Sequence, residues 1–482
     1  MSDAALKLGY GIPKDTSVVV NRTTKTYKFL HNTYNPGDIA TCTFPTGTDY
    51  IDTRRSFLEF EFNNDYTPPP PPPGLPGETL YSFGVHGSMC NVIQQICIYS
   101  RTGDELCRIE DFNLLSNMLL PLTYDREWFS RQGAGMWHGN RLYNSKQTAV
   151  IPMYILSPLF GYGRLLPAAL VSGMRVELTL ESADKVTFGA QVFIDIAQPP
   201  YDTQEPANGT NYFLSDMYFN VEVVKLGDSI RMAMDEIIST KGIELVYTGW
   251  HHTFTEPGHD MQNNTTIMIR DSHARALRAF ARIRSRENGT ETNSIHPETQ
   301  RDSFRGEHIF PIAEYQWRHG ERYYPDGGVK NGNRPIIESY VHVLNAVNQY
   351  DGSRGQSLLP LFSDDPTWQI PHNTMLGFLS TGFGGIYPGF MPSFVGQIGS
   401  YVRDSHVIGV DLTRDSENSL SGRPVNNVEP LSLTLKCNDN TREYQYNSSD
   451  TVITAPPLRR LDVFMEYAKL VRVFTNNIQV EK

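Results

Sequence analysis

The sequence predicts an all-β protein with two β-domains in tandem, and two observations support this. Strand-like segments recur in the same order: Val221–Leu226 resembles Met465–Leu470, 244 positions later, and Val176–Glu181 resembles Leu431–Lys436, 255 positions later. Such self-similarity at a nearly fixed spacing is typical of repeated architecture. The length of 482 residues also suits two domains of roughly 200 residues better than one hydrophobic core.

Composition and charge narrow the class of protein. With 38 glycines, 31 prolines and 11% aromatic residues, the chain is rich in the residues that fill sheets and form turns. The formal net charge is −11, and the first 28 residues mix Lys and Arg with Asp, so they form no basic arm. Because phosphate neutralisation needs clustered cations, we expect no direct binding to nucleic acid.

The cysteines and the apolar segments indicate neither a metal framework nor a membrane protein. Five cysteines contain no CxxC pair, which favours buried, reduced thiols over zinc or a full disulfide set. The most apolar stretch, 148–174, is interrupted by Pro152, Pro158 and Pro167, so we expect no transmembrane segment. The N-terminus lacks the apolar run of a signal peptide, and no export by that route is expected.

In the first half, alternation predicts strands. Arg55–Phe62 places Phe60 and Phe62 on one face and two glutamates on the other, as in a half-buried strand. The following proline run, 68–73, cannot join a sheet interior and predicts a stiff surface loop rather than a recognition motif. Residues 91–99 and 105–109, joined by a Thr-Gly-Asp turn, predict a hairpin.

Helices are expected at only two places. Asp111–Leu120 could form a short helix, and Asp228–Lys241 is the clearest candidate, with Asp228 or Ser229 as N-cap and Gly242 at its end. This second helix lies mid-chain and marks the expected domain boundary.

In the second half, Ile243–Trp250 begins a new series of strands. Ala276–Arg286 is predicted to be a strand, because arginines and small apolar residues alternate along it. Its arginines are expected on a solvated or inter-subunit face rather than on nucleic acid. Residues 377–401 show no clean period, and long loops of this kind often contact partners.

The segment 251–260 is the best candidate for a metal site, with possible ligands His251, His259 and Asp260. Its spacing matches no standard ligand motif, and Pro257-Gly258 would break any helix. A polar loop or strand end is therefore favoured over a metal.

Signatures of catalysis are missing from the sequence. There is no GxSxG nucleophile elbow, no phosphate-binding GxxxxGK[ST] loop and no GxGxxG after a strand. We therefore predict no catalytic residue, no cofactor and no enzymatic role.

The order and spacing of several segments resemble the double jelly-roll major capsid proteins of double-stranded DNA viruses, the group that includes virophages, polinton-like viruses and nucleocytoplasmic large DNA viruses. The segments that carry the resemblance lie along nearly the whole chain: Tyr50–Phe60, Leu166–Leu170 with Gly173–Leu178, Tyr315–Gly320 with Tyr323–Pro325, Asp411–Arg414, Ser421-Gly422, Asn426-Asn427 and Leu461–Phe474. The proline run and residues 260–307 depart from the pattern.

This resemblance implies two tandem eight-stranded jelly-roll β-sandwiches with long loops and few short helices. It implies an N-terminal arm (1–24), a first jelly roll (25–227), a linking helix (228–241) and a second jelly roll (242–482). The family's function implies a homotrimeric, pseudo-hexameric capsomer in an icosahedral virion shell. Neighbouring capsomers, penton proteins and minor capsid proteins are then the expected partners.

Two alternatives remain open at this stage. One is a jelly-roll carbohydrate-binding protein of the fibre or lectin kind, which glycan binding through exposed aromatic residues would support. The other is a β-sandwich metal-dependent enzyme, which stoichiometric metal lost on replacing His251 and His259 would support.

Overall fold

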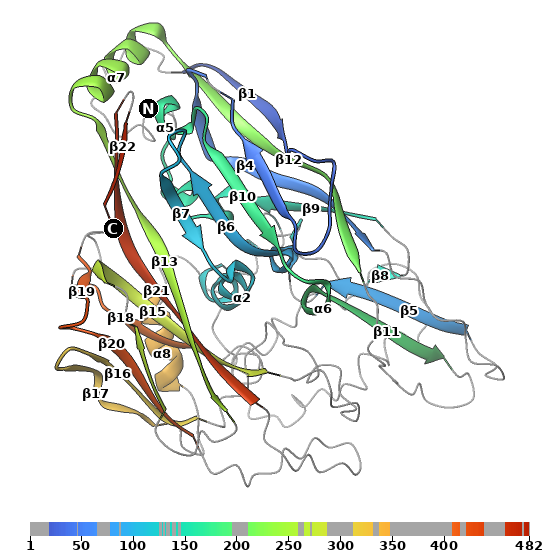
Figure 1. Cartoon of the computed structure of the whole chain (residues 1–482), viewed down its shortest axis with the longest axis vertical. Helices are drawn as coiled ribbons and strands as arrows, with labels where there is room; N and C mark the ends of the chain where they lie inside the picture. The colour runs from blue at the N-terminus through green and yellow to red at the C-terminus, as the bar shows by residue number, and fades with distance from the viewer. Residues whose placement is uncertain are drawn as a thin grey trace.

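A computed structural model shows two β-sandwiches side by side, each made of two packed antiparallel sheets (Figure 1). The structure describes residues 19–45, 47–64, 78–85, 88–124, 128, 131, 135–136, 141–142, 146–194, 211–258, 265–269, 272–286, 312–330, 337–347, 407–414, 421–437, 458–474 and 477–481.

Eight strands form the first sandwich, which we call the first roll. They are β1 (Val19–Lys28), β3 (Ile39–Thr43), β4 (Tyr50–Asn64), β6 (Ile93–Tyr99), β7 (Glu105–Ile109), β9 (Gln147–Pro152), β10 (Arg175–Leu180) and β12 (Tyr212–Leu226). One sheet has the order β1-β12-β4-β9 and the other β3-β10-β6-β7, and the short β2 (Thr33–Tyr34) pairs with β12.

Eight further strands form the second sandwich, the second roll. They are β13 (Ile243–Gly258), β14 (Thr265–Ile269), β15 (His273–Arg286), β16 (Ile312–His319), β17 (Arg322–Lys330), β18 (Ile408–Asp411), β20 (Leu431–Cys437) and β21 (Leu458–Val473). Its sheets have the orders β13-β21-β15-β18 and β14-β20-β16-β17. The short β19 (Arg423–Val425) pairs with β15, and β22 (Ile478–Glu481) pairs with β21.

The two rolls share one topology. If the eight strands of each roll are counted in chain order, both rolls have one sheet ordered 1-8-3-6 and one ordered 2-7-4-5. This is the two-sheet, Greek-key arrangement of a jelly roll. The recurring segments occupy equivalent strands: Val221–Leu226 and Met465–Leu470 lie in the eighth strands, and Val176–Glu181 and Leu431–Lys436 lie in or at the end of the seventh. The predicted fold class is confirmed.

Local patterns explain individual strands. In β4, Phe60 and Phe62 are buried while Glu59 and Glu61 stay half-exposed, as the alternation predicted. The predicted hairpin is β6 and β7, paired in antiparallel register. The predicted arginine-rich strand is β15.

The two predicted helices are present as α2 (Phe112–Thr123) and α7 (Asp228–Thr240), and α8 (Ile337–Ala346) follows β17. α7 joins the rolls at the upper end in Figure 1. Its predicted N-cap is wrong, because Gly227 is the N-cap and Asp228 lies in the first turn. Gly242 follows the helix with a φ of 74°, a left-handed conformation that favours glycine.

Several shorter helices lie in the loops of the first roll: η1 (Met89–Val92), α4 (Met153–Leu156), η2 (Phe160–Tyr162), α5 (Ala168–Val171) and α6 (Ala183–Val186). Among the described helices, none is long and apolar enough to cross a membrane.

A small third sheet extends away from the first roll (Figure 1). It has the order β11-β5-β8, with β5 at Glu78–Val85, β8 at Arg141–Leu142 and β11 at Thr187–Ile194. The sequence did not predict it, since its strands come from three separate loops. The predicted proline loop lies outside the described residues, as does the segment 377–401.

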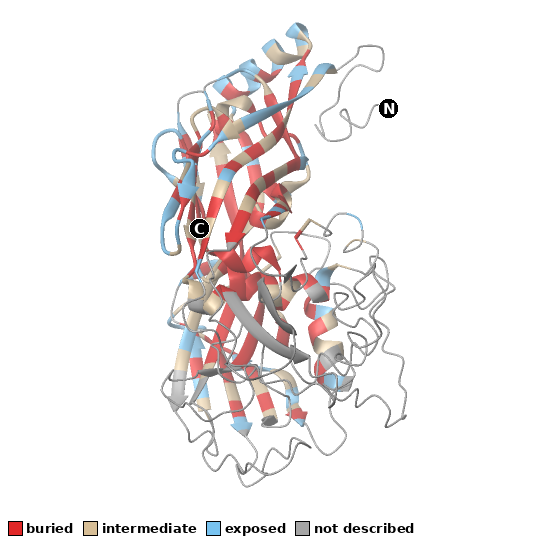
Figure 2. Ribbon diagram, turned by 90° about the vertical axis from the view of Figure 1, so that its right-hand side faces the viewer, coloured by how far each residue is buried: buried red, intermediate tan, exposed pale blue. Residues whose placement is uncertain are grey.

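The apolar core of the first roll continues into the second. One buried cluster holds the first roll's core together with Tyr247, Phe280, Phe464 and Val471 of the second roll. A separate cluster, including Trp317 and Met465, fills the second sandwich itself. Figure 2 shows buried residues in both sandwiches and in the region where they meet. The two rolls are therefore packed together through an apolar interface.

Four of the five cysteines are free, buried thiols: Cys42, Cys90, Cys97 and Cys107. Burial raises the pKa of Cys42 and Cys90 to about 12 and that of Cys107 to about 11. Because the thiolate is the reactive form, these thiols should be inert in the folded protein. We predict that Ellman's reagent titrates at most one thiol per native chain and five after denaturation. Two or more fast-reacting native thiols would contradict this packing.

Candidate assembly interface between the rolls

The second roll lies with its strands β13, β21 and β15 against the first roll. Along β21, every residue from Leu461 to Leu470 is buried. In its first half, Val463 and Met465 face the core of the second roll while Phe464, on the other side, belongs to the cluster shared with the first roll. In its second half, the side that carries Met465 also reaches the first roll, through Lys469. Three charged residues, Asp462, Glu466 and Lys469, are buried within this stretch. Buried charges are costly unless they are paired, so their partners identify what holds the interface together.

Lys469 and Tyr247 cap the free edge of the first roll's β7. The Lys469 ammonium donates to the carbonyl oxygens of Glu105, at 3.2 Å, and Leu106, at 2.7 Å. The Tyr247 hydroxyl donates to the same Leu106 carbonyl at 2.6 Å. An edge strand exposes unpaired backbone groups that can recruit another chain. Here side chains of the second roll satisfy them.

His252 is held between two carboxylates from different rolls. Its Nε2 lies 3.0 Å from Asp462 Oδ1 on β21, and its Nδ1 lies 3.0 Å from Asp111 Oδ2 at the start of α2. The ring stacks on Phe464, with centroids 4.3 Å apart. Arg460 donates to the same Asp462 oxygen at 2.8 Å and lies 3.6 Å from Asp111. Two cations thus balance two carboxylates.

The geometry favours the imidazolium form of His252, because both ring nitrogens face carboxylate oxygens. Burial lowers the pKa of His252, but the hydrogen bonds and charges of Asp111 and Asp462 outweigh burial and raise it above its ordinary value. For Asp111, burial raises the pKa, but His252 and Arg460 together lower it. Each group therefore stabilises the charged form of the other.

We predict that this interface weakens as the pH rises. A raised folded pKa means that the stabilisation by His252 is complete below its unfolded pKa of about 6.5 and is lost as the pH rises through the folded value. The thermal unfolding midpoint should therefore fall as the pH rises above about 6.5. His252→Gln should lower the midpoint at pH 6 and flatten this slope. Equal slopes in both proteins would show that His252 is not the titrating group.

A third contact ties α8 to the same face. Arg278 on β15 forms an ion pair with the buried Glu466 on β21, and its Nη1 donates to the Ala346 carbonyl of α8 at 2.9 Å. Arg282, on the same strand, is only 2% exposed. The expected solvated or inter-subunit face is therefore wrong for Arg282, which is buried, whereas Arg278 is partly exposed and has its partners within the second roll.

Of the three candidate metal ligands, the described part of the chain includes His251 alone. His251 lies on β13 next to the ring of His273, with centroids 5.4 Å apart, whereas His259 and Asp260 lie outside the described residues. Within the described ranges, no group of three or more His, Cys, Asp or Glu side chains is placed to hold a metal ion. It is the neighbouring His252 that joins the interface.

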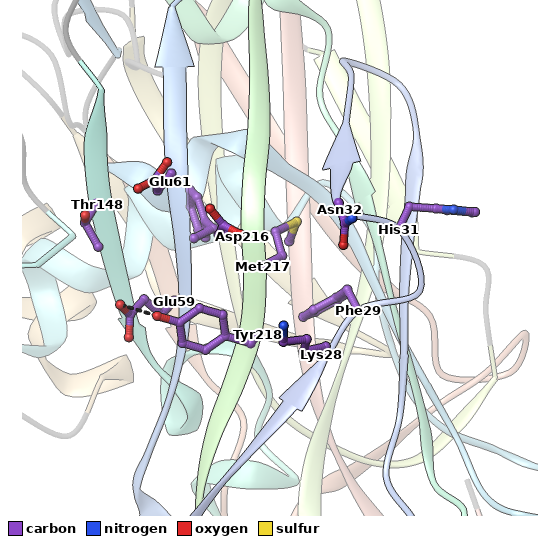
Figure 3. A pocket seen from close by; sticks show the side chains of 11 residues that line it. Lys28, Phe29, His31, Asn32, Glu59, Glu61, Thr148, Asp216, Met217 and Tyr218 are labelled. Atoms are coloured by element: carbon purple, nitrogen blue, oxygen red, sulfur yellow. Dashed lines mark hydrogen bonds between the residues drawn. The ribbon is translucent and has the colours of Figure 1, made fainter.

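The outer face of the first roll's β1, β12 and β4 is polar and partly exposed, unlike its counterpart in the second roll. Glu222 pairs with Arg22 at 3.1 Å and with Arg55 at 3.7 Å. Tyr218 and Asn220 donate to Glu59 at 2.6 and 2.9 Å. A hollow of about 220 Å³ lies on this face. Figure 3 shows residues that line it, among them Glu59 and Tyr218.

Comparisons place this arrangement among known folds. No protein-family model and no curated protein matches the sequence. Vp54 of PBCV-1, fitted into a reconstruction of the virophage Sputnik, superposes with a TM-score of 0.57 and 11% identity over 98% of this chain and 99% of that chain. A chain in a quasi-atomic description of the PBCV-1 virus capsid gives the same values.

A chain of the Sputnik virophage structure matches with a TM-score of 0.55 and 10% identity, covering 97% of this chain and 89% of that one. The chain has a double jelly-roll fold. At such identities the likeness establishes the fold alone. The resemblance seen in the sequence is therefore confirmed at the level of fold, and both jelly rolls are included in the match.

Proposed function

We propose that this double jelly-roll chain is a major capsid protein, a structural subunit of an icosahedral virion shell without a catalytic role. The observation that carries the proposal is the near-complete coverage of both chains in the match to the PBCV-1 capsid chain, 98% and 99%. A match of this extent includes both rolls in the same order. A single β-sandwich shared by the two proteins would cover only about half of each chain.

The interface between the rolls supports assembly into a homotrimer. It is heterologous: the second roll contributes a sheet face, and the first contributes the β7 edge and α2. The corresponding surfaces that the chain leaves uncovered among its described residues are the first roll's β1-β12-β4 face and the second roll's β17 edge. Heterologous contacts close into rings when the rotation allows it. Three chains of two rolls would then form a ring of six similar units.

The remaining parts of the proposal follow from the same role. We propose the domain division stated above, with the helix 228–241 between the rolls, although β1 already pairs with β12 from Val19, inside the stretch assigned to the arm. Neighbouring capsomers, penton proteins and minor capsid proteins are the proposed partners in the shell.

Electron microscopy of the purified protein tests this function. We expect particles with a threefold axis and a hexagonal outline, and flat hexagonal arrays at high concentration. Particles of twofold symmetry, or binding to glycans without any ordered assembly, would overturn the proposal in favour of a carbohydrate-binding protein.

A further inference from the structure

Equivalent positions of the two rolls carry the same charged residues. The eighth strands align as Val221-Glu-Val-Val-Lys-Leu226 and Met465-Glu-Tyr-Ala-Lys-Leu470, so Glu222 corresponds to Glu466 and Lys225 to Lys469. The two glutamates behave alike, since each pairs with an arginine of the third strand, Arg55 or Arg278.

The two lysines also lie on equivalent sides of their strands. Val221 and Met465, four residues before each lysine, both face the core of their own roll. Their environments differ, however. Lys469 is 2% exposed and caps the β7 edge of the first roll. The side chain of Lys225 is exposed, and among the described residues Lys225 takes part in no hydrogen bond or ion pair beyond the backbone pairing of its strand with β1.

The edge that Lys469 caps has a counterpart in the second roll. In the first roll, Ser100 N donates to the Asp104 carbonyl across the turn, so the next pair, Tyr99 and Glu105, points its backbone groups away from the ladder. The Glu105 carbonyl therefore faces outward and accepts from Lys469.

The residue pairs of the β16–β17 hairpin alternate in the same way between backbone groups that point into the ladder and backbone groups that point outward. His319 and Arg322 flank a two-residue turn, so the next pair is Arg318 and Tyr323. Alternation in an antiparallel ladder then turns the Tyr323 carbonyl outward, to the free edge of β17. Within the described residues, β17 pairs with β16 alone, and Tyr323 is 43% exposed.

We propose that Lys225 of one copy of this chain caps the β17 edge of a second copy, donating to the Tyr323 carbonyl as Lys469 donates to that of Glu105. This inference rests on the proposed trimer and names the contact that would join its chains. The occupant is a second copy, because the capping surface and the capped edge both occur in this chain and one such contact already joins its own two rolls.

Paired cysteines test the contact directly. In a Cys437→Ser background, Lys225→Cys with Tyr323→Cys should be linked by a short bis-maleimide into covalent dimers and trimers on a denaturing gel. Lys28→Cys with Tyr323→Cys is the matched control. On β1, Asn21 lies beside Lys225, and Lys28 is seven residues further along the strand. At 3.3 Å per residue, Lys28 is therefore about 23 Å from the position of Lys225. This control pair should not link.

A second variant measures how much Lys225 contributes to the stability of the trimer. In Lys225→Met, the concentration below which trimers dissociate should be roughly tenfold higher, which is the effect of losing a charge-assisted hydrogen bond. Lys241→Met, an exposed lysine after α7, should leave it unchanged.

The outcomes separate this contact from the function itself. If light scattering shows a trimer but the Lys225–Tyr323 pair fails to link, or links no better than the Lys28 pair, the contact is wrong and the capsid role stands. If the unmodified protein is a monomer at every concentration, the proposed function fails and the contact fails with it.

Discussion

Asp462→Asn should destabilise the protein by about 3–5 kcal/mol, the usual cost of breaking a buried ion pair from one side. Asp462 is fully buried, and its Oδ1 accepts from both His252, at 3.0 Å, and Arg460, at 2.8 Å. A neutral amide would leave the buried His252 and the partly buried Arg460 with Asp111 as the one carboxylate of the network just described. Denaturant unfolding at pH 7 measures the change.

Glu244→Gln is the matched control for this variant. Glu244 lies on β13 and pairs with Arg472 on β21 at 2.8 Å, but both side chains are exposed. Because exposed ion pairs contribute little, the free energy of unfolding should stay essentially unchanged. If both variants were equally mild, the His252 network would not hold the rolls together.

Glu466→Gln should lower the free energy of unfolding by a similar amount, about 3–5 kcal/mol, because it too removes the buried carboxylate of an ion pair. Glu466 is 4% exposed and is the carboxylate partner of Arg278, which in turn holds the C-terminal end of α8 through the Ala346 carbonyl. Without its counter-charge, Arg278 should no longer fix α8 on the sheet. Amide hydrogen exchange should therefore speed up across Ile337–Ala346 more than elsewhere.

The equivalent glutamate of the first roll supplies the comparison. Glu222→Gln removes the same group from the same strand position, but Glu222 and its partners Arg22 and Arg55 are partly exposed. Its loss should cost about 1 kcal/mol or less when measured on the dissociated chain. If Glu222→Gln proved as damaging as Glu466→Gln, burial between the rolls would not be the reason for the difference.

Much of the fold could be predicted because it depends on local patterns. The alternation in β4, the turn between β6 and β7 and the helix α7 are all encoded within a few residues. The recurrence of the eighth strands was visible because equivalent positions in two similar rolls carry similar residues. The third sheet was missed, since its strands come from loops that are far apart in the sequence.

The interface was harder to predict, and β21 shows the reason. Asp462 and Glu466 alternate with apolar residues, which is the pattern of a strand with one face in water. In the structure that face is covered by the first roll. Alternation of polar and apolar residues shows which face of a strand is apolar. It does not show whether the polar face contacts water or a neighbouring domain with charged residues of its own.

His252 illustrates the same limit. The histidine-rich segment contains His251 as a candidate metal ligand, yet it is His252 that lies between Asp111 and Asp462. These partners are 141 and 210 positions away in the sequence. Only the packing of two rolls brings them together, so no local spacing could indicate them.

The central claim is that the contact between the two rolls of one chain repeats between chains until a ring of six rolls closes. Light scattering coupled to size-exclusion chromatography tests it most directly. We predict a single species with about three times the 54.5 kDa mass of the chain. A protein that remains at 54.5 kDa at all concentrations, or that forms stable dimers, would contradict the account.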